Sequence, residues 1–190
     1  LGTRIKNPDN PKKIIDQCIE MQRKMLSGFK GNKKINMKKW KEAQAPSQFA
    51  ISLSGEPTIY PKLAELILEL RKRKITSFLV TNGLNPRVLL KLKRKKALPT
   101  QLYISLNTPN ETLYNKWHRS KERQAWKKFN ESLEIMKNLK TRIVLRMTLV
   151  KDLNMIEPEN YAKLILKANP DFVEVKGFVS IGYARKRLGY

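Results

Sequence analysis

The sequence is poor in cysteine, in acidic residues and in long apolar runs. Its one cysteine, Cys18, excludes a framework of disulfide bonds. No run approaches the roughly 18 apolar residues that cross a membrane, and no charged-then-apolar leader opens the chain, so we expect a cytoplasmic protein with no membrane partner. Neither G-x-G-x-x-G nor G-x-x-x-x-G-K-[ST] occurs, which removes the main support for a dinucleotide-binding or P-loop protein.

Acidic residues are too few to balance the basic ones. The chain has 40 Lys and Arg against 16 Asp and Glu, which gives a formal net charge of +24. This excess is larger than solubility requires and favours a polyanionic partner. Heat-adapted proteins also gain lysine, but they gain glutamate with it, and here glutamate does not keep pace. The basic runs lack the Trp, Phe and Leu face of a membrane-surface helix, so nucleic acid is the expected partner.

The apolar residues follow a pattern that alternates between strand and helix spacing. Five stretches have the length and composition of strands, and they cover residues 48–53, 75–81, 101–106, 142–150 and 172–178. Helical spacing covers residues 9–27, 37–43, 60–74, 86–95, 124–140 and 158–168. Strands that alternate with helices predict parallel pairing, an outer layer of helices, and functional groups at the carboxyl ends of the strands.

The length limits the fold that these elements can form. A chain of 190 residues with 41% hydrophobic content can bury one sizeable core, so we expect residues 1–190 to form a single domain. A closed barrel of eight strand–helix units needs about 250 residues. Five visible strands therefore fit an incomplete barrel or a doubly wound sheet, and we expect the chain to be part of a longer protein.

Polar residues occur at the carboxyl end of every predicted strand. These ends read Ser54-Gly55-Glu56-Pro57, Thr81-Asn82-Gly83, Ser105-Leu106-Asn107, Arg146-Met147-Thr148 and Glu174-Val175-Lys176. In a parallel α/β fold the five ends converge on one mouth. Glutamate, arginine, asparagine and hydroxyl side chains there predict a pocket for a small ligand with an amino group, a carboxylate and hydroxyls.

Four segments together resemble a known family. They are "SLSGEPTIYP", "LVTNG", "YISLNTPNE" and "VEVKGFVSIGYARKRLGY", in this order and at these spacings. They are similar to the radical S-adenosylmethionine (SAM) enzymes that synthesise 4-demethylwyosine on tRNA. The resemblance implies an α/β fold, a partial (βα)6 TIM-like barrel of the radical SAM type, whose first strand and cluster-binding loop lie upstream of this chain and whose C-terminal part is missing from it.

The resemblance also implies the cofactors, SAM and a 4Fe-4S cluster. In the family the Gly-Glu-Pro motif lines the pocket for the SAM amino group. By extension the expected cofactor-binding residues are Ser54, Gly55, Glu56, Pro57, Thr81, Asn82, Ser105, Asn107, Arg146 and Thr148. Two alternatives remain: Glu56 caps the helix that begins near Pro61, and Asn82 is a turn residue before Gly83.

The cluster ligands are the main departure from the family pattern. Radical SAM enzymes bind the cluster through three cysteines spaced C-x3-C-x2-C, whereas one thiolate cannot hold a cluster. Cys18 falls on the apolar stripe of the first predicted helix, and we expect it to be buried as a packing residue. We therefore expect the cluster ligands upstream of Leu1 and no metal ligand within the chain.

The implied reaction is a modification of tRNA by an enzyme of the lyase class. A radical derived from SAM removes a hydrogen from the methyl group of N1-methylguanosine, beside the anticodon of tRNA-Phe, and pyruvate donates two carbons. Adding two carbons from pyruvate is easier if the keto acid is held as an imine on a lysine, and Lys176 is the candidate lysine. The alternative is that Lys176 pairs with Glu174 or binds a phosphate. Expected partners are tRNA, pyruvate and an electron donor, with the protein a monomer. Two other functions stay open: a non-catalytic RNA-binding module, and a radical SAM enzyme with another substrate.

Several basic and aromatic residues are candidates for contact with RNA. We expect basic contacts from Arg119, Arg185, Lys186 and Arg187. Trp40 and Trp117 are candidates for stacking on bases, whereas the helical spacing around Trp126 favours the core. The lone His118 beside Arg119 is expected at the surface, either solvated or in contact with RNA.

Overall fold

The computed structural model describes residues 5–182 and residue 185, and it divides into two compact units. The first unit comprises the residues up to Thr81 together with Arg87–Leu102 and Leu139–Thr141. The second unit comprises Asn82–Pro86, Tyr103–Asn138 and the described residues from Arg142 onward. In the described part of the chain no helix is both long and apolar enough to span a bilayer.

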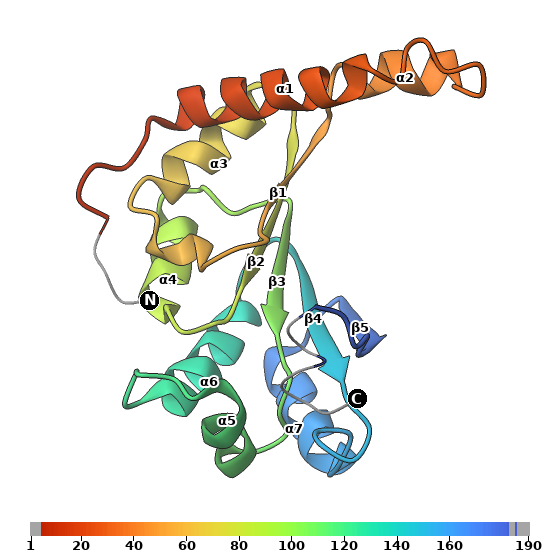
Figure 1. Cartoon of the computed structure of the whole chain (residues 1–190). Coiled ribbons are helices and arrows are strands. Elements are labelled where there is room, and N and C mark those ends of the chain that lie inside the picture. The colour runs from red at the N-terminus through yellow and green to blue at the C-terminus, as the bar shows by residue number, and fades with distance from the viewer. Residues whose placement is uncertain (1–4, 183–184, 186–190) are drawn as a thin grey trace. The chain divides into compact units, whose positions relative to one another are not determined.

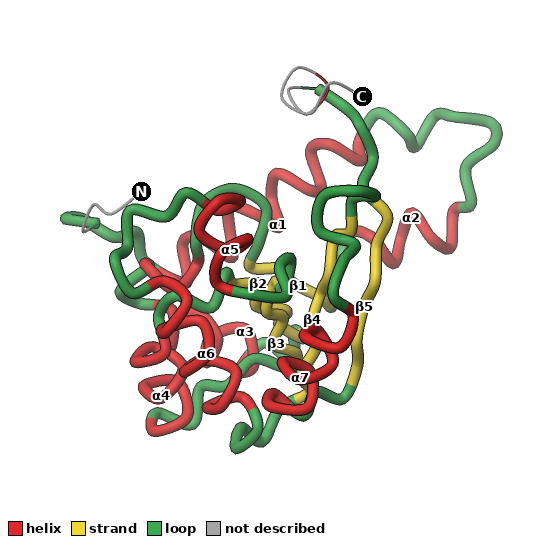
Figure 2. The backbone as a smooth tube through the Cα atoms, turned by 90° about the horizontal axis from the view of Figure 1, so that it is seen from below, coloured by secondary structure: helices red, strands yellow, loops and turns green. Residues whose placement is uncertain are grey.

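The five predicted strands are all present. They are β1 (Gln48–Ile51), β2 (Thr76–Thr81), β3 (Gln101–Ser105), β4 (Arg142–Leu149) and β5 (Phe172–Gly177), drawn in yellow in Figure 2. Their order in the sheet is β1-β2-β3-β4-β5, and the β1–β2 and β4–β5 pairs are parallel. A doubly wound sheet reverses its strand order at a switch point. The strand order here is not reversed. Of the two folds that the chain length allows, the incomplete barrel is therefore favoured over the doubly wound sheet.

The helices agree with the expected pattern, with two additions. The structure has α1 (Pro11–Ser27), α2 (Met37–Ala43), α3 (Leu63–Lys72), α4 (Pro86–Arg94), α6 (Ala125–Met136) and α7 (Pro158–Ala168) (Figure 1). The sequence analysis missed the short 3-10 helix η1 (Pro57–Ile59) and the helix α5 (Glu111–His118). The side chain of Asn110 accepts a hydrogen bond from the Leu113 amide, so a capping residue was the available sign of α5.

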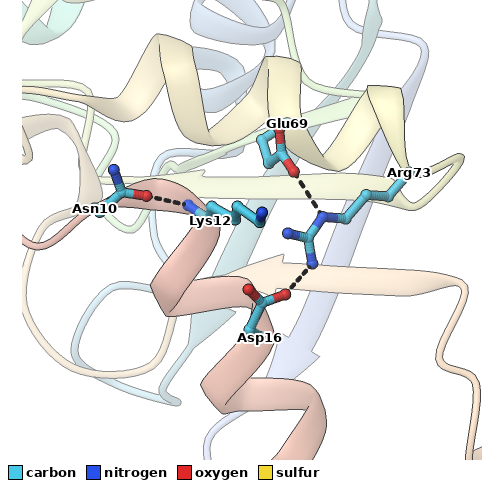
Figure 3. Close-up of polar contacts among 5 residues, drawn as sticks. All are labelled: Asn10, Lys12, Asp16, Glu69 and Arg73. Carbon is cyan, nitrogen blue, oxygen red and sulfur yellow. Dashed lines mark hydrogen bonds and ion pairs between the residues drawn. The ribbon is translucent and has the colours of Figure 1, made fainter.

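In the first unit, α1 is attached to α3 by a small core and an ion-pair cluster. Ile15 of α1 packs against Leu66 and Leu70 of α3, and all three are buried. Arg73, directly after α3, donates from Nη1 to Asp16 of α1 at 2.6 Å and from Nε to Glu69 at 2.8 Å (Figure 3). The hydrogen bond with Asp16, and then that with Glu69, raise the pKa of Arg73. The guanidinium therefore remains charged and joins the two helices.

In the second unit, Asn154 ties the ends of β3 and β4 together. Its side chain is fully buried; Oδ1 accepts from the Val150 amide at 2.6 Å, and Nδ2 donates to the carbonyls of Asn107 and Thr148 at 2.7 and 2.8 Å. The hydroxyl of Tyr161 on α7 lies 2.8 Å from the Asn154 carbonyl. These bonds supply partners to backbone groups that leave the strands, as burial requires.

Gly83 makes the turn after β2 and has no room for a side chain. Its φ is +76°, and a Cβ atom there would lie 3.2 Å from Phe129 Cδ2 and 3.3 Å from Ile104 Cγ2. Ser132 donates a 2.6 Å hydrogen bond to the Gly83 carbonyl. Both the backbone conformation and the packing therefore require glycine.

We predict that Gly83→Ala lowers the free energy of unfolding by about 2 kcal/mol, because the methyl group adds left-handed strain to overpacking. Gly28→Ala is the matched control: Gly28 has a φ of −64° and no atom within 4 Å of an added Cβ. This control is expected to change the free energy by at most about 0.5 kcal/mol, in the stabilising direction. Urea unfolding measures both, and equal effects of the two substitutions would contradict the argument.

Candidate active site

Glu56 is held in place by two threonines, Thr58 of η1 and Thr81 at the carboxyl end of β2. Its Oε1 accepts from the Thr58 amide at 3.1 Å, from Thr58 Oγ1 at 2.6 Å and from Thr81 Oγ1 at 2.6 Å. Thr58 and Thr81 are buried, whereas Glu56 is half-buried. We call these three residues the Glu56 cluster. It presents a carboxylate whose position is fixed before any ligand binds, which suits an ammonium group.

Glu56 does cap a helix, as the alternative proposed, but it caps a different helix from the one expected. Glu56 is the N-cap of η1, which begins at Pro57, and not of a helix near Pro61. The loop before it contains Leu53 and Gly55 at φ values of +91° and +83°, and Ser54 and Gly55 are exposed. A non-glycine residue at positive φ indicates local strain, of the kind that gathers near functional sites.

Asn82 adopts the turn role that the sequence left open. Its Oδ1 accepts from the Leu84 amide at 2.9 Å, which forms a side-chain turn just before the left-handed Gly83. Asn82 is exposed. Contact with a cofactor remains a prediction for this residue.

Asn107 and Thr148 are engaged in the structure of the second unit. The Oδ1 of Asn107 accepts from the Thr148 amide at 3.0 Å, and the Thr148 carbonyl accepts from Asn154. Ser105 lies half-buried at the end of β3. The side-chain oxygen of Asn107 therefore joins the ends of β3 and β4, and contact with a cofactor remains a prediction for Asn107 and Thr148.

Arg146 lies at the centre of a charged cluster across β4 and β5. Its Nε donates to Glu174 Oε2 at 2.8 Å, and its guanidinium lies 4.5 Å from the centroid of the Tyr103 ring. Lys176 Nζ lies 3.0 Å from Glu174 Oε1, and the Lys176 side chain is 49% exposed. We call Tyr103, Arg146, Glu174 and Lys176 the Arg146 cluster. The hydrogen bond from Arg146 is the main reason that the pKa of Glu174 is lowered.

The strand register explains why these charges meet. Arg146 pairs with Glu174 and Thr148 with Lys176 along the parallel β4–β5 pair. The expectation that Glu174 and Lys176 share one face of β5 is confirmed by their ion pair. The sequence analysis missed Tyr103 and Thr58, although Tyr103 lies two positions before Ser105 and thus on the same face of β3.

Comparison with known proteins identifies the family of the chain. The family model described as "Radical SAM superfamily" matches residues 35–165. The chain belongs to the radical SAM superfamily. The expected α/β fold of the partial-barrel type is confirmed for this radical SAM chain.

The relatives of this radical SAM chain point to one enzyme. It is 47% identical, over 99% of its length and 55% of the relative, to the S-adenosyl-L-methionine-dependent tRNA 4-demethylwyosine synthase of Pyrococcus abyssi. It is 35% identical to the protein of the same name from Methanocaldococcus jannaschii, over 98% of the chain and 58% of the relative. The chain thus spans about half the length of the curated relatives it matches.

Two solved structures have the same fold. One, described as the "Crystal structure of archaeal TYW1", matches at a TM-score of 0.77 with 34% identity, covering 91% of this chain and 59% of that chain. The other, the "Structure of TYW1 with a lysine-pyruvate adduct bound", matches at a TM-score of 0.80 with 34% identity, covering 93% and 58%.

Membership of the superfamily implies SAM and a 4Fe-4S cluster. The residues of this chain suit the first of these cofactors but not the second. The fixed carboxylate of the Glu56 cluster fits the SAM ammonium group. The sequence has one cysteine, and the described residues hold no group of three His, Cys, Asp or Glu placed for a metal ion. Residues of this chain therefore fit SAM, whereas cluster ligands must come from elsewhere.

The residues proposed for RNA contact differ in their surroundings. Arg119 is exposed in a left-handed conformation at the end of α5, and Arg185 is exposed and donates to the Ser180 carbonyl. Lys186 and Arg187 lie outside the described residues. Trp40 is half-buried and donates from Nε1 to the Leu26 carbonyl.

Two expectations were wrong. Cys18 is exposed, because the buried stripe of α1 runs through Pro11 and Ile15 and leaves Cys18 on a neighbouring face. His118 is half-buried rather than solvated: its ring lies 4.4 Å from that of Tyr114, and its buried Nε2 has no hydrogen-bond partner among the residues that the structure describes. Tyr114 in turn packs against Trp126 and Phe129, and Trp126, which was expected in the core, is half-buried.

We predict a pH-dependent stability that comes from His118. Burial lowers the pKa of His118 in the folded chain below the usual 6.5. As the pH falls below 6.5, the unfolded chain therefore binds a proton at this residue more readily than the folded chain does. The free energy of unfolding should therefore fall as the pH drops below about 6.5, by at most about 1.4 kcal/mol per pH unit. Denaturation between pH 7 and 5.5 measures the effect.

His118→Phe supplies the control, since the chain has no other histidine. The phenyl ring suits the aromatic neighbours and cannot titrate. The variant should lose the pH dependence in this range, and an unchanged slope would assign it to other groups.

Proposed function

We propose that this chain is the SAM-binding core of a tRNA 4-demethylwyosine synthase. The enzyme would act on N1-methylguanosine beside the anticodon of tRNA-Phe, with pyruvate as the donor of two carbons. The observation that carries the proposal is the Glu56 cluster, a fixed carboxylate within a Gly-Glu-Pro turn at a strand end. The names of relatives up to 47% identical over 99% of the chain support it.

SAM and the cluster, when bound, would supply a carbon radical able to remove hydrogen from a methyl group. The contribution of this chain is to bind and orient. Glu56 would pair with the SAM ammonium group, while Thr58 and Thr81 keep the carboxylate in one position. Because the threonine hydroxyls already donate to Oε1, Glu56 needs no rearrangement when the cofactor arrives.

The Arg146 cluster supports a site for a keto acid. Arg146 offers a guanidinium to a carboxylate, and Lys176 offers an amine that forms an imine once it leaves Glu174 and loses its proton. A solved relative carries a lysine-pyruvate adduct by its description, which supports imine chemistry in this family. We assign the amine to Lys176 as part of the proposal.

The charge of the chain supports tRNA as the substrate. A net charge of +24 favours the phosphate backbone, and Arg119 and Arg185 are exposed basic candidates for contact. The target base would have to leave the stack of the anticodon loop to react. An external electron donor and a monomeric enzyme complete the proposal.

Glu56→Gln in the full-length enzyme tests the cofactor role. Glutamine keeps the oxygen that accepts the three hydrogen bonds but loses the charge, so the fold should remain and the Kd for SAM should rise roughly tenfold or more. Formation of 4-demethylwyosine on tRNA that carries N1-methylguanosine, measured by mass spectrometry after digestion, should fall in parallel at limiting SAM.

Glu42→Gln is the matched control. Glu42 is a carboxylate of the same unit that pairs with Lys39 outside the site. This control should bind SAM as the natural protein does. Unchanged SAM affinity in Glu56→Gln would remove Glu56 from the site, and full-length protein that forms no wyosine product would contradict the proposed function itself.

Lys176 is tested by trapping an imine with borohydride and labelled pyruvate in the full-length enzyme, followed by peptide mapping. We expect the label on Lys176 and no label in Lys176→Ala. Lys167→Ala, which removes another half-exposed lysine of the second unit with an acidic neighbour, should label normally. Label on a different lysine, with Lys176→Ala still active, would leave Lys176 as a binding residue only.

A further inference from the structure

A cavity of about 400 Å³ opens at the end of β2 opposite the Glu56 cluster. Its lining includes Thr76 and Ser77, which begin β2, whereas Thr81 ends that strand. At about 3.3 Å per residue these ends are roughly 16 Å apart. The cavity, which lies wholly in the first unit, is therefore separate from the candidate active site.

The lining of the cavity is basic and contains no acidic residue among those that the structure describes. Arg71, Lys74 and Lys140 contribute three positive charges. The guanidinium of Arg71 is fixed by two hydrogen bonds of 2.7 Å, from Nη1 to the Lys96 carbonyl and from Nη2 to the Leu98 carbonyl. Lys74 and Lys140 are exposed, and neither pairs with an acidic side chain within the described chain.

Two hydroxyls in the lining can still donate a hydrogen bond. The Ser77 amide donates to Thr100 Oγ1 at 3.1 Å, and the Thr100 amide donates to Ser77 Oγ at 3.2 Å. Each hydroxyl oxygen thus accepts from a backbone amide, which leaves its own hydrogen for another acceptor. Thr100 is exposed, whereas Ser77 is only 3% exposed, so Thr100 is the more accessible of the two donors. The cavity therefore combines positive charge with hydrogen-bond donors, which suits an anion with several acceptor oxygens.

The backbone at Lys74 adopts a left-handed conformation. Lys74 follows the C-cap of α3 at a φ of +58°, in a turn closed by the hydrogen bond from the Ile75 amide to the Leu70 carbonyl. Glycine is the usual residue at this position, because it adopts the left-handed conformation without steric penalty. Lys96 has the same conformation after α4, but of these two lysines only Lys74 lines the cavity, where its charge adds to those of Arg71 and Lys140.

We propose that this cavity binds a phosphate group. Phosphate presents several acceptor oxygens and a charge that three cations and two hydroxyl donors can satisfy together. The group comes either from a free phosphorylated compound or from the backbone of an RNA, and both share this chemistry. The proposal goes beyond the proposed function, since it places an anion site at the end of β2 opposite the Glu56 cluster.

Titration calorimetry of inorganic phosphate into the full-length protein, without SAM and at constant ionic strength, tests the site. We expect saturable binding with a Kd that rises roughly tenfold in Lys74→Gln and in Lys140→Gln. Lys93→Gln is the matched control, because Lys93 is an exposed lysine of α4 that does not line the cavity. No saturable binding, or equal weakening by Lys93→Gln, would overturn the proposal.

Lys74→Gly separates binding from folding. Glycine relieves the left-handed strain, so the variant should melt about 2–4 °C higher than the natural protein. It should nevertheless bind phosphate roughly tenfold more weakly. A purely structural Lys74 would show phosphate binding unchanged by this substitution, and that result would overturn the proposal even if the other variants failed to fold.

A competition experiment identifies the source of the phosphate. If an anticodon stem-loop RNA raises the apparent Kd for phosphate and binds more weakly to Lys74→Gln than to Lys93→Gln, the cavity takes the RNA backbone. If the RNA leaves phosphate binding unchanged, the cavity takes a small phosphorylated compound. Both results support the site. These measurements need neither SAM nor a cluster, so their failure is distinct from failure of the proposed function.

Discussion

Polar backbone groups at the ends of parallel strands must find hydrogen-bond partners, and this requirement shapes both ends of the described sheet. Asn154 and Asn107 satisfy the amides and carbonyls that leave β3 and β4. Glu56 does the same at the start of η1, and Ser77 with Thr100 does so at the start of β2. Groups that stabilise the chain in this way are held rigidly. A rigid polar group at a strand end is in turn suited to binding a ligand.

The sequence was sufficient to predict the strands, most helices and the shared face of Glu174 and Lys176, because these depend on periodicity and alternation. It did not predict α5, whose eight residues are too few for a clear helical period. Cys18 and His118 were misplaced for a related reason. The side of a helix that becomes buried, and the aromatic rings that close over a histidine, depend on contacts distant in sequence.

The candidate site shows a second limit of sequence patterns. Residue type predicted polar groups at every strand end, but it did not reveal how much of their bonding capacity the fold already uses. The side-chain oxygen of Asn107 accepts a hydrogen bond from the Thr148 amide. The guanidinium of Arg146 interacts with both Glu174 and the Tyr103 ring. The register of β4 against β5 brings Arg146 and Glu174 together, and Tyr103 reaches Arg146 from β3. Under the proposed function, Arg146 and Lys176 would exchange Glu174 for the substrate as their partner.

The attachment of α1 has a consequence for how the first unit opens. Of its 17 residues only Pro11 and Ile15 are buried, and Arg73 adds the ionic link to Asp16. A helix with so little buried surface behaves as a separate cooperative segment, whose amides exchange with solvent hydrogen through local detachment. The β1–β2 pair and α3 can stay folded during that event. We therefore expect the first unit to release its N-terminal helix before its strands unfold.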